Sequence, residues 1–260
     1  MDWYRMKTVL IILFLGINLF LAALLGYESY SEHKVDQVKT EAILQTLERG
    51  GIKVEARLRP SSPRLRALRL ENPYADSFAF AARVLGDGAH HQENTFEKDG
   101  NKLSFTENGF IFEAASPAVP PQKKHITSLK SALEAMGLSM RYATGKTENN
   151  AVIFTQKVDG VPLFGAQLRV MPCADGSVSR IQGTWANIAD IYGEKSRVVL
   201  PAQALLTFLQ EGTHEGETIT DATCGYSVLL SDGAYRTADA VPAWRIETES
   251  GTVFFYDARQ

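Results

Sequence analysis

The hydrophobic pattern is dominated by one long apolar stretch near the start of the chain. Residues 8–27 contain no charged side chain, and their number matches the roughly 20 residues that an α-helix needs to cross a bilayer. Arg5 and Lys7 precede the stretch and Glu28 follows it, which by the positive-inside rule predicts a cytoplasmic N-terminus. The pattern therefore predicts a cytoplasmic segment at residues 1–7, a single transmembrane helix at residues 8–27, and an extracytoplasmic body beyond it.

The alternative for this stretch is a signal peptide that is cleaved after export. Such a peptide has an apolar core of about 7 to 15 residues, followed by small residues at the cleavage site. Here the apolar run is longer, and no Ala-x-Ala sequence precedes Glu28. Trp3, Tyr4 and Tyr27 bracket the run, as aromatic rings do at the two membrane interfaces. An uncleaved anchor in the cell membrane is therefore the preferred interpretation.

The next segment has the spacing of an amphipathic helix. Residues 28–49 are rich in helix formers and are followed by two glycines, which are typical of a helix C-terminus. The apolar residues at helical spacing are Val35, Val38, Ala42 and Ile43. We expect this stripe to pack on the rest of the body.

Shorter segments complete a predicted first domain at residues 28–116. Alternation at residues 52–58 and 65–70 predicts strands, and apolar spacing at residues 74–85 predicts a helix. Turn-forming Asp-Gly and Asn-Gly pairs divide the remainder of this domain into three further strands. These strands are expected at residues 93–97, 102–106 and 110–114.

A linker and a second domain come next. Residues 117–124 contain three prolines, which indicates a linker, and residues 125–260 are predicted to form the second domain. Helices are expected at residues 126–136 and from residue 201, each followed by three strands. The predicted strands are residues 151–158, 163–171, 178–187, 226–230, 243–248 and 252–256.

This order of elements predicts an α+β fold. Because short turns rather than crossovers join the strands, we expect two extracytoplasmic domains of antiparallel sheet with helices packed on one face. Trp185 and Trp244 lie inside strand patterns and are expected to pack in the core. An open sheet edge that accepts a peptide strand is the alternative use of such a sheet, although the sequence does not identify the edge.

Composition and charge narrow the class of protein. The chain of 260 residues is 45% hydrophobic and 22% charged, which is ordinary for a folded protein. The net charge is −3, and since residues 1–27 contribute +1, the predicted body carries −3 − 1 = −4. A nucleic-acid-binding protein would show clustered positive charge and a high pI. We therefore expect no nucleic-acid partner.

The sequence carries none of the common signatures of catalysis or metal binding. The five histidines do not form an HExxH motif, and no Gly-x-Ser-x-Gly, Walker or GxGxxG motif occurs. His90 and His91 are interpreted as a solvated loop pair, because neighbours on a strand would point to opposite faces. We predict no catalytic residue, no metal site and no cofactor, although carboxylate pairs leave an enzyme as an alternative class. Cys173 and Cys224 could form one disulfide or remain two buried thiols, and the sequence does not decide between these alternatives.

Two groups of residues are candidate binding sites. The first is five arginines within thirteen positions, Arg57, Arg59, Arg64, Arg66 and Arg69. They form either the solvated face of a strand pair or a patch for anionic head groups, a wall polymer or an acidic partner domain. The second group is Asn18, Ala22 and Gly26, which are spaced by four and lie on one stripe of the apolar helix.

The stripe predicts contact with a partner helix. Lipid offers no hydrogen-bond partner to the Asn18 amide, and small residues at positions 22 and 26 let a neighbouring backbone approach. The alternative is an anchor that merely tolerates one amide in the membrane.

The start of the chain also carries a likeness to a known family. It begins Met-Asp-Trp, has basic residues before the apolar stretch, and carries Asn-Leu-Phe at residues 18–20. Further stretches of the same likeness are residues 51–54, 154–166 and 242–246. In these stretches the chain resembles the YycI family, relatives of YycH. Members of this family are accessory proteins of the WalK/WalR (YycG/YycF) two-component system, which governs cell-wall metabolism in Gram-positive bacteria.

The resemblance implies a membrane-anchored, non-enzymatic regulator. Its implied partners are a sensor histidine kinase of WalK type, a YycH-like accessory protein and the membrane. It would adjust the kinase through contacts between transmembrane helices, with the external domains as the sensing or protein-binding part. Residues 154–166 are also similar to PepSY-type domains, so the alternative function is an extracytoplasmic inhibitor or chaperone module for a peptidase.

Overall fold

The computed structural model describes residues 3–58, 62–107, 109–122, 125–212, 216–228 and 235–259; within the first helix, the side chains at residues 3–5, 8–9, 25–26, 28–29 and 31–33 are not described. The contacts divide the chain into two compact units. Unit 1 consists of Met1–Pro63, Val199–Ala222 and Ile246–Phe254. Unit 2 consists of Arg64–Val198, Thr223–Arg245 and Phe255–Gln260.

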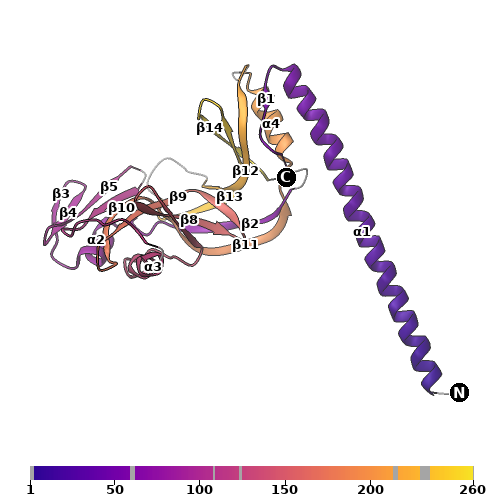
Figure 1. The fold of residues 1–260 in the computed structure, drawn as a ribbon, viewed down its shortest axis with the longest axis horizontal. Helices are drawn as coiled ribbons and strands as arrows, with labels where there is room; N and C mark the ends of the chain where they lie inside the picture. The colour runs from indigo at the N-terminus through magenta and orange to yellow at the C-terminus, as the bar shows by residue number, and fades with distance from the viewer. Residues whose placement is uncertain are drawn as a thin grey trace. The chain divides into compact units, whose positions relative to one another are not determined.

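Unit 1 begins with α1 (Trp3–Arg49), which is one continuous helix through the apolar stretch and the predicted helix after it (Figure 1). The glycine pair ends it as predicted. The Gly50 N–H donates to the Thr46 carbonyl at 3.0 Å, and Gly51 adopts a φ of +79°, which glycine accepts without strain. In the described part of the chain, no helix meets the combined length and hydropathy expected of a bilayer-crossing segment.

The rest of unit 1 packs around the end of α1. Helix α4 (Pro201–Gln210) contacts α1, and β1 (Lys53–Val54) pairs in parallel with the start of β12 (Thr218–Val228). As predicted, α4 starts at the proline, and the Gln203 side chain accepts from the Leu200 N–H at 2.9 Å. The buried side chains of this unit include Leu47, Ile52, Leu205, Phe208 and Ile219.

The prediction that the four apolar residues of the segment 28–49 pack on the body is wrong for three of them. Val35 and Val38 are 49% and 66% exposed, and Ala42 is exposed as well, while Ile43 is half-buried. The buried face instead carries Asp36, Thr40 and Leu47. Thr40 is tolerated there because its hydroxyl donates to the Asp36 carbonyl at 2.8 Å.

Unit 2 is built on a large, mostly antiparallel sheet. Its strands are β2 (Arg64–Glu71), β3 (His90–Gln92), β4 (Thr95–Lys98), β5 (Asn101–Thr106), β6 (Gly109–Glu113), β7 (Ala143–Glu148), β8 (Ala151–Val158), β9 (Val161–Pro172), β10 (Val178–Thr184) and β11 (Asn187–Arg197), with parts of β12, β13 (Thr237–Thr248) and β14 (Val253–Asp257). The strand order is β11-β2-β13-β12-β9-β10-β6-β5-β4-β3. Outside this order, β8 also pairs with β9, and β7 pairs with β8. The predicted α+β class is confirmed, but the sheet is mixed, because β12 runs parallel to β9 at Tyr226↔Leu163.

Two helices cover part of this sheet and enclose the main core. Helix α2 (Ser77–Leu85) is capped by Asp76, whose carboxylate accepts a hydrogen bond from the Ala79 N–H. This helix contacts β4 and β5. Helix α3 (His125–Ala135) contacts β9. The core between them includes Phe80, Phe110, Leu129, Phe154 and Trp185. Trp185 and Trp244 are 0% and 5% exposed, which confirms their predicted place in the core.

Several element boundaries differ from the predicted ones. The strand expected at residues 52–58 is reduced to the two residues of β1, whereas β3, β7 and β11 were not predicted. The predicted linker at residues 117–124 lies within unit 2. The two units defined by the contacts therefore differ from the predicted domains at residues 28–116 and 125–260. Residues 123–124 of that segment lie outside the described residues. That division stays a prediction about separately folding domains.

Candidate functional site

The stripe predicted on the apolar helix lies on α1. Asn18 and Ala22 are exposed, and Asn18 donates from its side-chain nitrogen to the Phe14 carbonyl at 2.8 Å. This bond uses one of the two N–H donors of the amide and none of its acceptor capacity. Gly26 continues the stripe along the helix backbone, and its surroundings lie outside the described side chains. A partner helix at this stripe stays a prediction.

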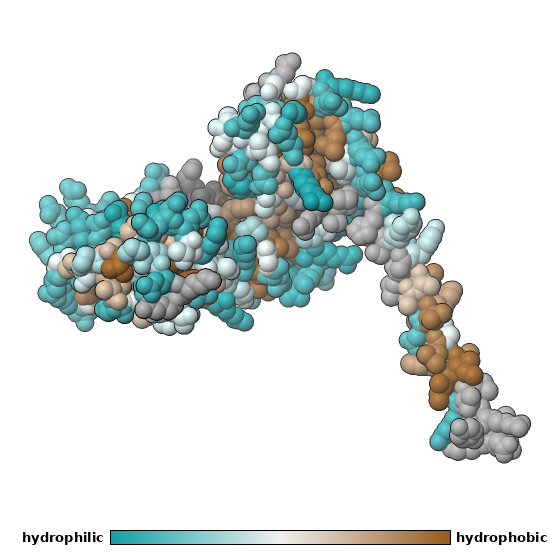
Figure 2. All heavy atoms as spheres, in the orientation of Figure 1, coloured by the Kyte–Doolittle hydropathy of each residue, from teal (hydrophilic) through white to brown (hydrophobic). Residues whose placement is uncertain are grey.

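Large apolar side chains surround the stripe and are exposed. Between Leu10 and Leu24, the large hydrophobic side chains are 49–77% accessible, and Figure 2 shows brown, hydrophobic atoms along this part of α1. Contiguous apolar surface of this kind marks sites of membrane or protein interaction, since leaving it in water costs roughly 25 cal/mol per Å². This part of α1 is therefore a candidate interaction surface.

The three predicted arginines that lie on β2 do not share one face of the strand. Arg57 is exposed in unit 1, and Arg59 lies outside the described residues. Arg64, Arg66 and Arg69 are exposed on β2 in unit 2. Since successive strand residues point to opposite faces, Arg64 and Arg66 share one face of β2 and Arg69 belongs to the other.

The neighbours of Arg69 agree with this separation. Asp239 pairs with Arg69 in the register of β13, and the carboxylate lies 3.8 Å from the Arg69 guanidinium. The same guanidinium lies 4.9 Å from the ring centre of Tyr192 on β11. Arg69 is thus partly neutralised by its own sheet, whereas Arg64 stands opposite Arg197 in the register. Binding of anionic groups by this cluster stays a prediction.

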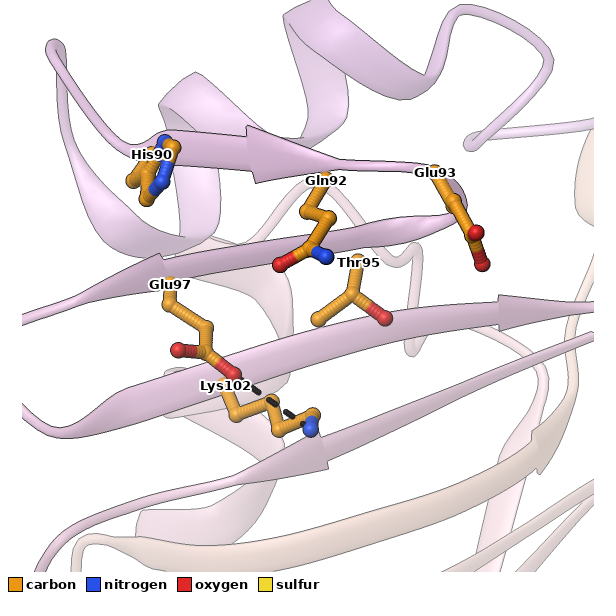
Figure 3. Close-up of a pocket in the computed structure, with 6 residues that line it drawn as sticks. All are labelled: His90, Gln92, Glu93, Thr95, Glu97 and Lys102. Carbon is orange, nitrogen blue, oxygen red and sulfur yellow. Dashed lines mark ion pairs between the residues drawn. The ribbon is translucent and has the colours of Figure 1, made fainter.

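A shallow polar hollow of about 200 Å³ lies on the meander strands of unit 2. It is lined by His90, Gln92, Glu93, Thr95, Glu97 and Lys102, and Figure 3 shows these side chains across neighbouring strands. The Lys102 ammonium lies 3.3 Å from the Glu97 carboxylate, so the charges of these two groups offset each other. In the part of the chain that the structure describes, no group of His, Cys, Asp or Glu is arranged to hold a metal ion. Sequence reasoning missed the hollow because it predicted a loop where β3 lies.

The two neighbouring histidines do point to opposite faces, as expected for a strand. His90 lines the hollow. The centre of the His91 ring lies 4.4 Å from the centre of the Phe96 ring and 4.8 Å from that of the Phe78 ring. The prediction of a loop pair is wrong, because both residues belong to β3.

Both cysteines are free thiols, Cys173 buried and Cys224 half-buried. Burial raises the pKa of the Cys224 thiol to about 11, which suppresses the reactive thiolate. The disulfide that the sequence left open is therefore not formed in this structure. We assign no catalytic role to either thiol.

The segment at residues 154–166 forms the hairpin of β8 and β9. Asp159 and Gly160 take positive φ angles of 51° and 83° at its turn. Phe154 and Gln156 are almost fully buried, and the Gln156 side chain donates to the Ala186 carbonyl at 2.7 Å. Phe154 and Gln156, two of the residues behind the likeness to PepSY-type domains, therefore have a structural role in this chain.

Comparison with known proteins gives a family match over most of the chain. The family model described as YycI protein matches residues 31–259, while no curated protein matches the chain. A crystal structure of an uncharacterized protein from Eubacterium rectale is 8% identical, with a TM-score of 0.47, and the alignment covers 81% of this chain and 89% of that chain. Because the family model covers nearly all of it, the chain belongs to the YycI family and is an accessory regulator of the WalK/WalR two-component system.

Proposed function

We propose that this protein is a membrane-anchored, non-enzymatic regulator of a WalK-type sensor histidine kinase. Residues 8–27 anchor it, the N-terminus lies in the cytoplasm, and the body lies outside the cell. The observation that carries the proposal is the exposed apolar surface of α1, which needs lipid or a protein partner to cover it. The uncharged length of this segment and the basic residues before it support the same topology.

Contact with the kinase would run through the stripe of Asn18, Ala22 and Gly26. The Asn18 amide keeps its acceptor oxygen and one N–H available after its bond to Phe14. In a bilayer these groups gain roughly 0.6 to 2 kcal/mol from a hydrogen bond to a neighbouring helix. Small residues at positions 22 and 26 let the backbones approach closely enough to form it.

The external units would serve protein binding rather than chemistry. The polar hollow and the two free thiols lack the geometry of a nucleophile activated by a base. A YycH-like accessory protein is the expected partner outside the membrane. The exposed guanidinium groups of Arg64 and Arg66 offer it a positively charged contact.

Purification from native membranes tests the proposal. The tagged full-length protein should co-purify with the WalK-type kinase, and a cysteine-specific impermeant reagent should label an exposed body position, such as Gln37→Cys, in intact cells. Recovery of a peptidase and never of the kinase would favour the PepSY-type inhibitor or chaperone instead. Labelling only after the cells are broken would overturn the topology.

A further inference from the structure

The part of α1 beyond the apolar stretch has two different faces. At about 100° per residue, Asp36, Thr40 and Leu47 fall between about 100° and 140° from Val35 around the helix axis. These three side chains are buried within unit 1. Val38 and Ala42 lie within about 60° of Val35 on its other side. The centres of the two faces are thus about 150° apart.

The outward face carries three exposed apolar side chains, away from the buried face of α1. Val35 and Val38 are 49% and 66% exposed, and Ala42 is exposed too. Valine is not a favoured residue for an exposed helix surface, because its branched side chain lowers helix propensity. The spacing of three and then four residues is that of the a, d and a positions of a coiled coil. We call Val35, Val38 and Ala42 the seam.

Charged residues beside the seam select its partner. Lys34 and Lys39 are exposed and occupy the flanking g and e positions. In a parallel pair of two copies, Lys34 of one copy would face Lys39 of the other on both sides of the seam. The next such pair would be Glu41 and Thr46, which offers no compensating attraction. A second copy of this chain is therefore disfavoured.

We infer that the seam docks a parallel α-helix of a different membrane protein, whose own apolar seam is flanked by Asp or Glu side chains. Apolar contact would bury the two valines, and the acidic side chains would pair with Lys34 and Lys39. The inference rests on the proposed function, because a parallel arrangement needs both chains to leave the membrane in the same direction. It adds a contact with a further helix, just outside the membrane and on the side of α1 opposite to the contact proposed at Asn18.

A charge-reversed copy of the full-length chain is a defined probe for the seam. Lys34→Glu and Lys39→Glu would give that copy the acidic flanks that the natural partner should carry. Both copies receive Val38→Cys and different tags, are expressed together, and are treated in membranes with a cysteine cross-linker. Mixed pairs should form about fivefold more often than pairs of like copies, since two flanking pairs change from repulsion to attraction.

A matched control places the cysteine away from the seam. Gln37 is exposed on the same helix at about 200° from Val35, so Gln37→Cys in both copies should show no preference for mixed pairs. Equal cross-linking of mixed and like pairs at Val38→Cys would overturn the inference. An equal gain at Gln37→Cys would overturn it too, because it would show attraction without a defined seam.

The natural occupant is tested with the single variant Val38→Cys in native membranes, after its thiol has been labelled with a maleimide–benzophenone, which on irradiation inserts into a C–H bond of whatever chain lies beside it. We expect a cross-linked membrane protein whose helix carries Asp or Glu beside the linked position, identified by mass spectrometry. A second copy of this chain, a helix with Lys or Arg at those positions, or no cross-link would each overturn the inference. Kinase recovery in the purification described above does not depend on position 38, so failure of the seam and failure of the proposed function can be distinguished.

Discussion

Gly50 lies so close to Leu209 that a Cβ atom at position 50 would come within 2.6 Å of the leucine Cδ1. The contact joins the end of α1 to α4 within unit 1. We predict that Gly50→Ala lowers the free energy of unfolding by about 1 kcal/mol, the low end for overpacking, because the half-buried end of the Leu209 side chain must shift away from the added methyl group. Urea unfolding followed by circular dichroism measures this loss.

A second substitution checks the cause of that loss. Leu209→Ala makes room for the added methyl group, so the double variant should be less destabilised than the sum of the two single variants. Additive effects would show that the contact with Leu209 is not the reason.

Trp185 donates from its ring nitrogen to the Ser139 carbonyl at 3.1 Å while its side chain is fully buried. Trp185→Phe keeps much of the ring packing but leaves that carbonyl without its donor. We expect a loss of about 1–3 kcal/mol in the free energy of unfolding, the usual penalty for an unsatisfied buried polar group. Thermal unfolding measures it, and an unchanged melting temperature would show that another donor takes over.

The separation of the arginines predicts different effects on binding to anionic surfaces. Arg64→Gln with Arg66→Gln should weaken binding to anionic vesicles at low salt, and the difference should shrink at high salt. Arg69→Gln should change binding less, because Asp239 already offsets its charge. Each variant should keep its free energy of unfolding within about 0.5 kcal/mol, as exposed substitutions do. Vesicle co-sedimentation checks this, and equal binding by all variants would make these arginines a solvated face.

Two tyrosines, Tyr226 buried and Tyr74 half-buried, predict a loss of stability at alkaline pH. Removal from water raises the pKa of Tyr74 and of Tyr226 to about 12, from 10.0. The unfolded chain loses these protons near pH 10, whereas the folded chain holds them until about pH 12. Their contribution to stability is therefore complete below about pH 10 and is lost as the pH rises toward about 12.

Urea unfolding at about pH 8 and about pH 11 tests this linkage. We expect a lower midpoint at the higher pH, and a smaller drop in Tyr226→Phe, which removes one of the two groups. A drop of the same size in that variant would assign the effect to other residues.

The stripe of Asn18, Ala22 and Gly26 gives a prediction that separates anchoring from recognition. Asn18→Leu with Gly26→Leu should keep the protein in the membrane, since both changes increase hydrophobicity, but should weaken kinase association and regulation. Membrane fractionation and kinase co-purification measure the two effects. If an unrelated apolar span in place of this helix regulates equally well, recognition lies outside the membrane.

Local signals were enough to predict much of the fold. The glycine pair at the end of α1, Pro201 at the start of α4 and the Asp-Gly turn between β8 and β9 each act within a few residues of themselves. Propensity and turn chemistry therefore identify such boundaries without knowledge of the rest of the chain.

Features that depend on distant partners were not predictable in this way. Strand β7 is polar and mostly exposed, and it is a strand because β8 pairs with it. Which side of α1 is buried depends on the position of α4, which comes about 150 residues later. The pairing of Arg69 with Asp239 likewise results from the register of β2 with β13.

Because α1 is one continuous helix, it fixes the angle around its axis, as well as the distance, between the stripe and the buried face. Eighteen residues separate Asn18 from Asp36, Ala22 from Thr40 and Gly26 from Leu44. Eighteen residues make about five full turns at 3.6 residues per turn, so the stripe of Asn18, Ala22 and Gly26 points in the same direction as the buried face of α1. A rotation of unit 1 about the axis of α1 would therefore turn the stripe in the same direction, because the helix between them is continuous. One inserted residue between them would put the two out of alignment by about 100° while changing the length by only about 1.5 Å.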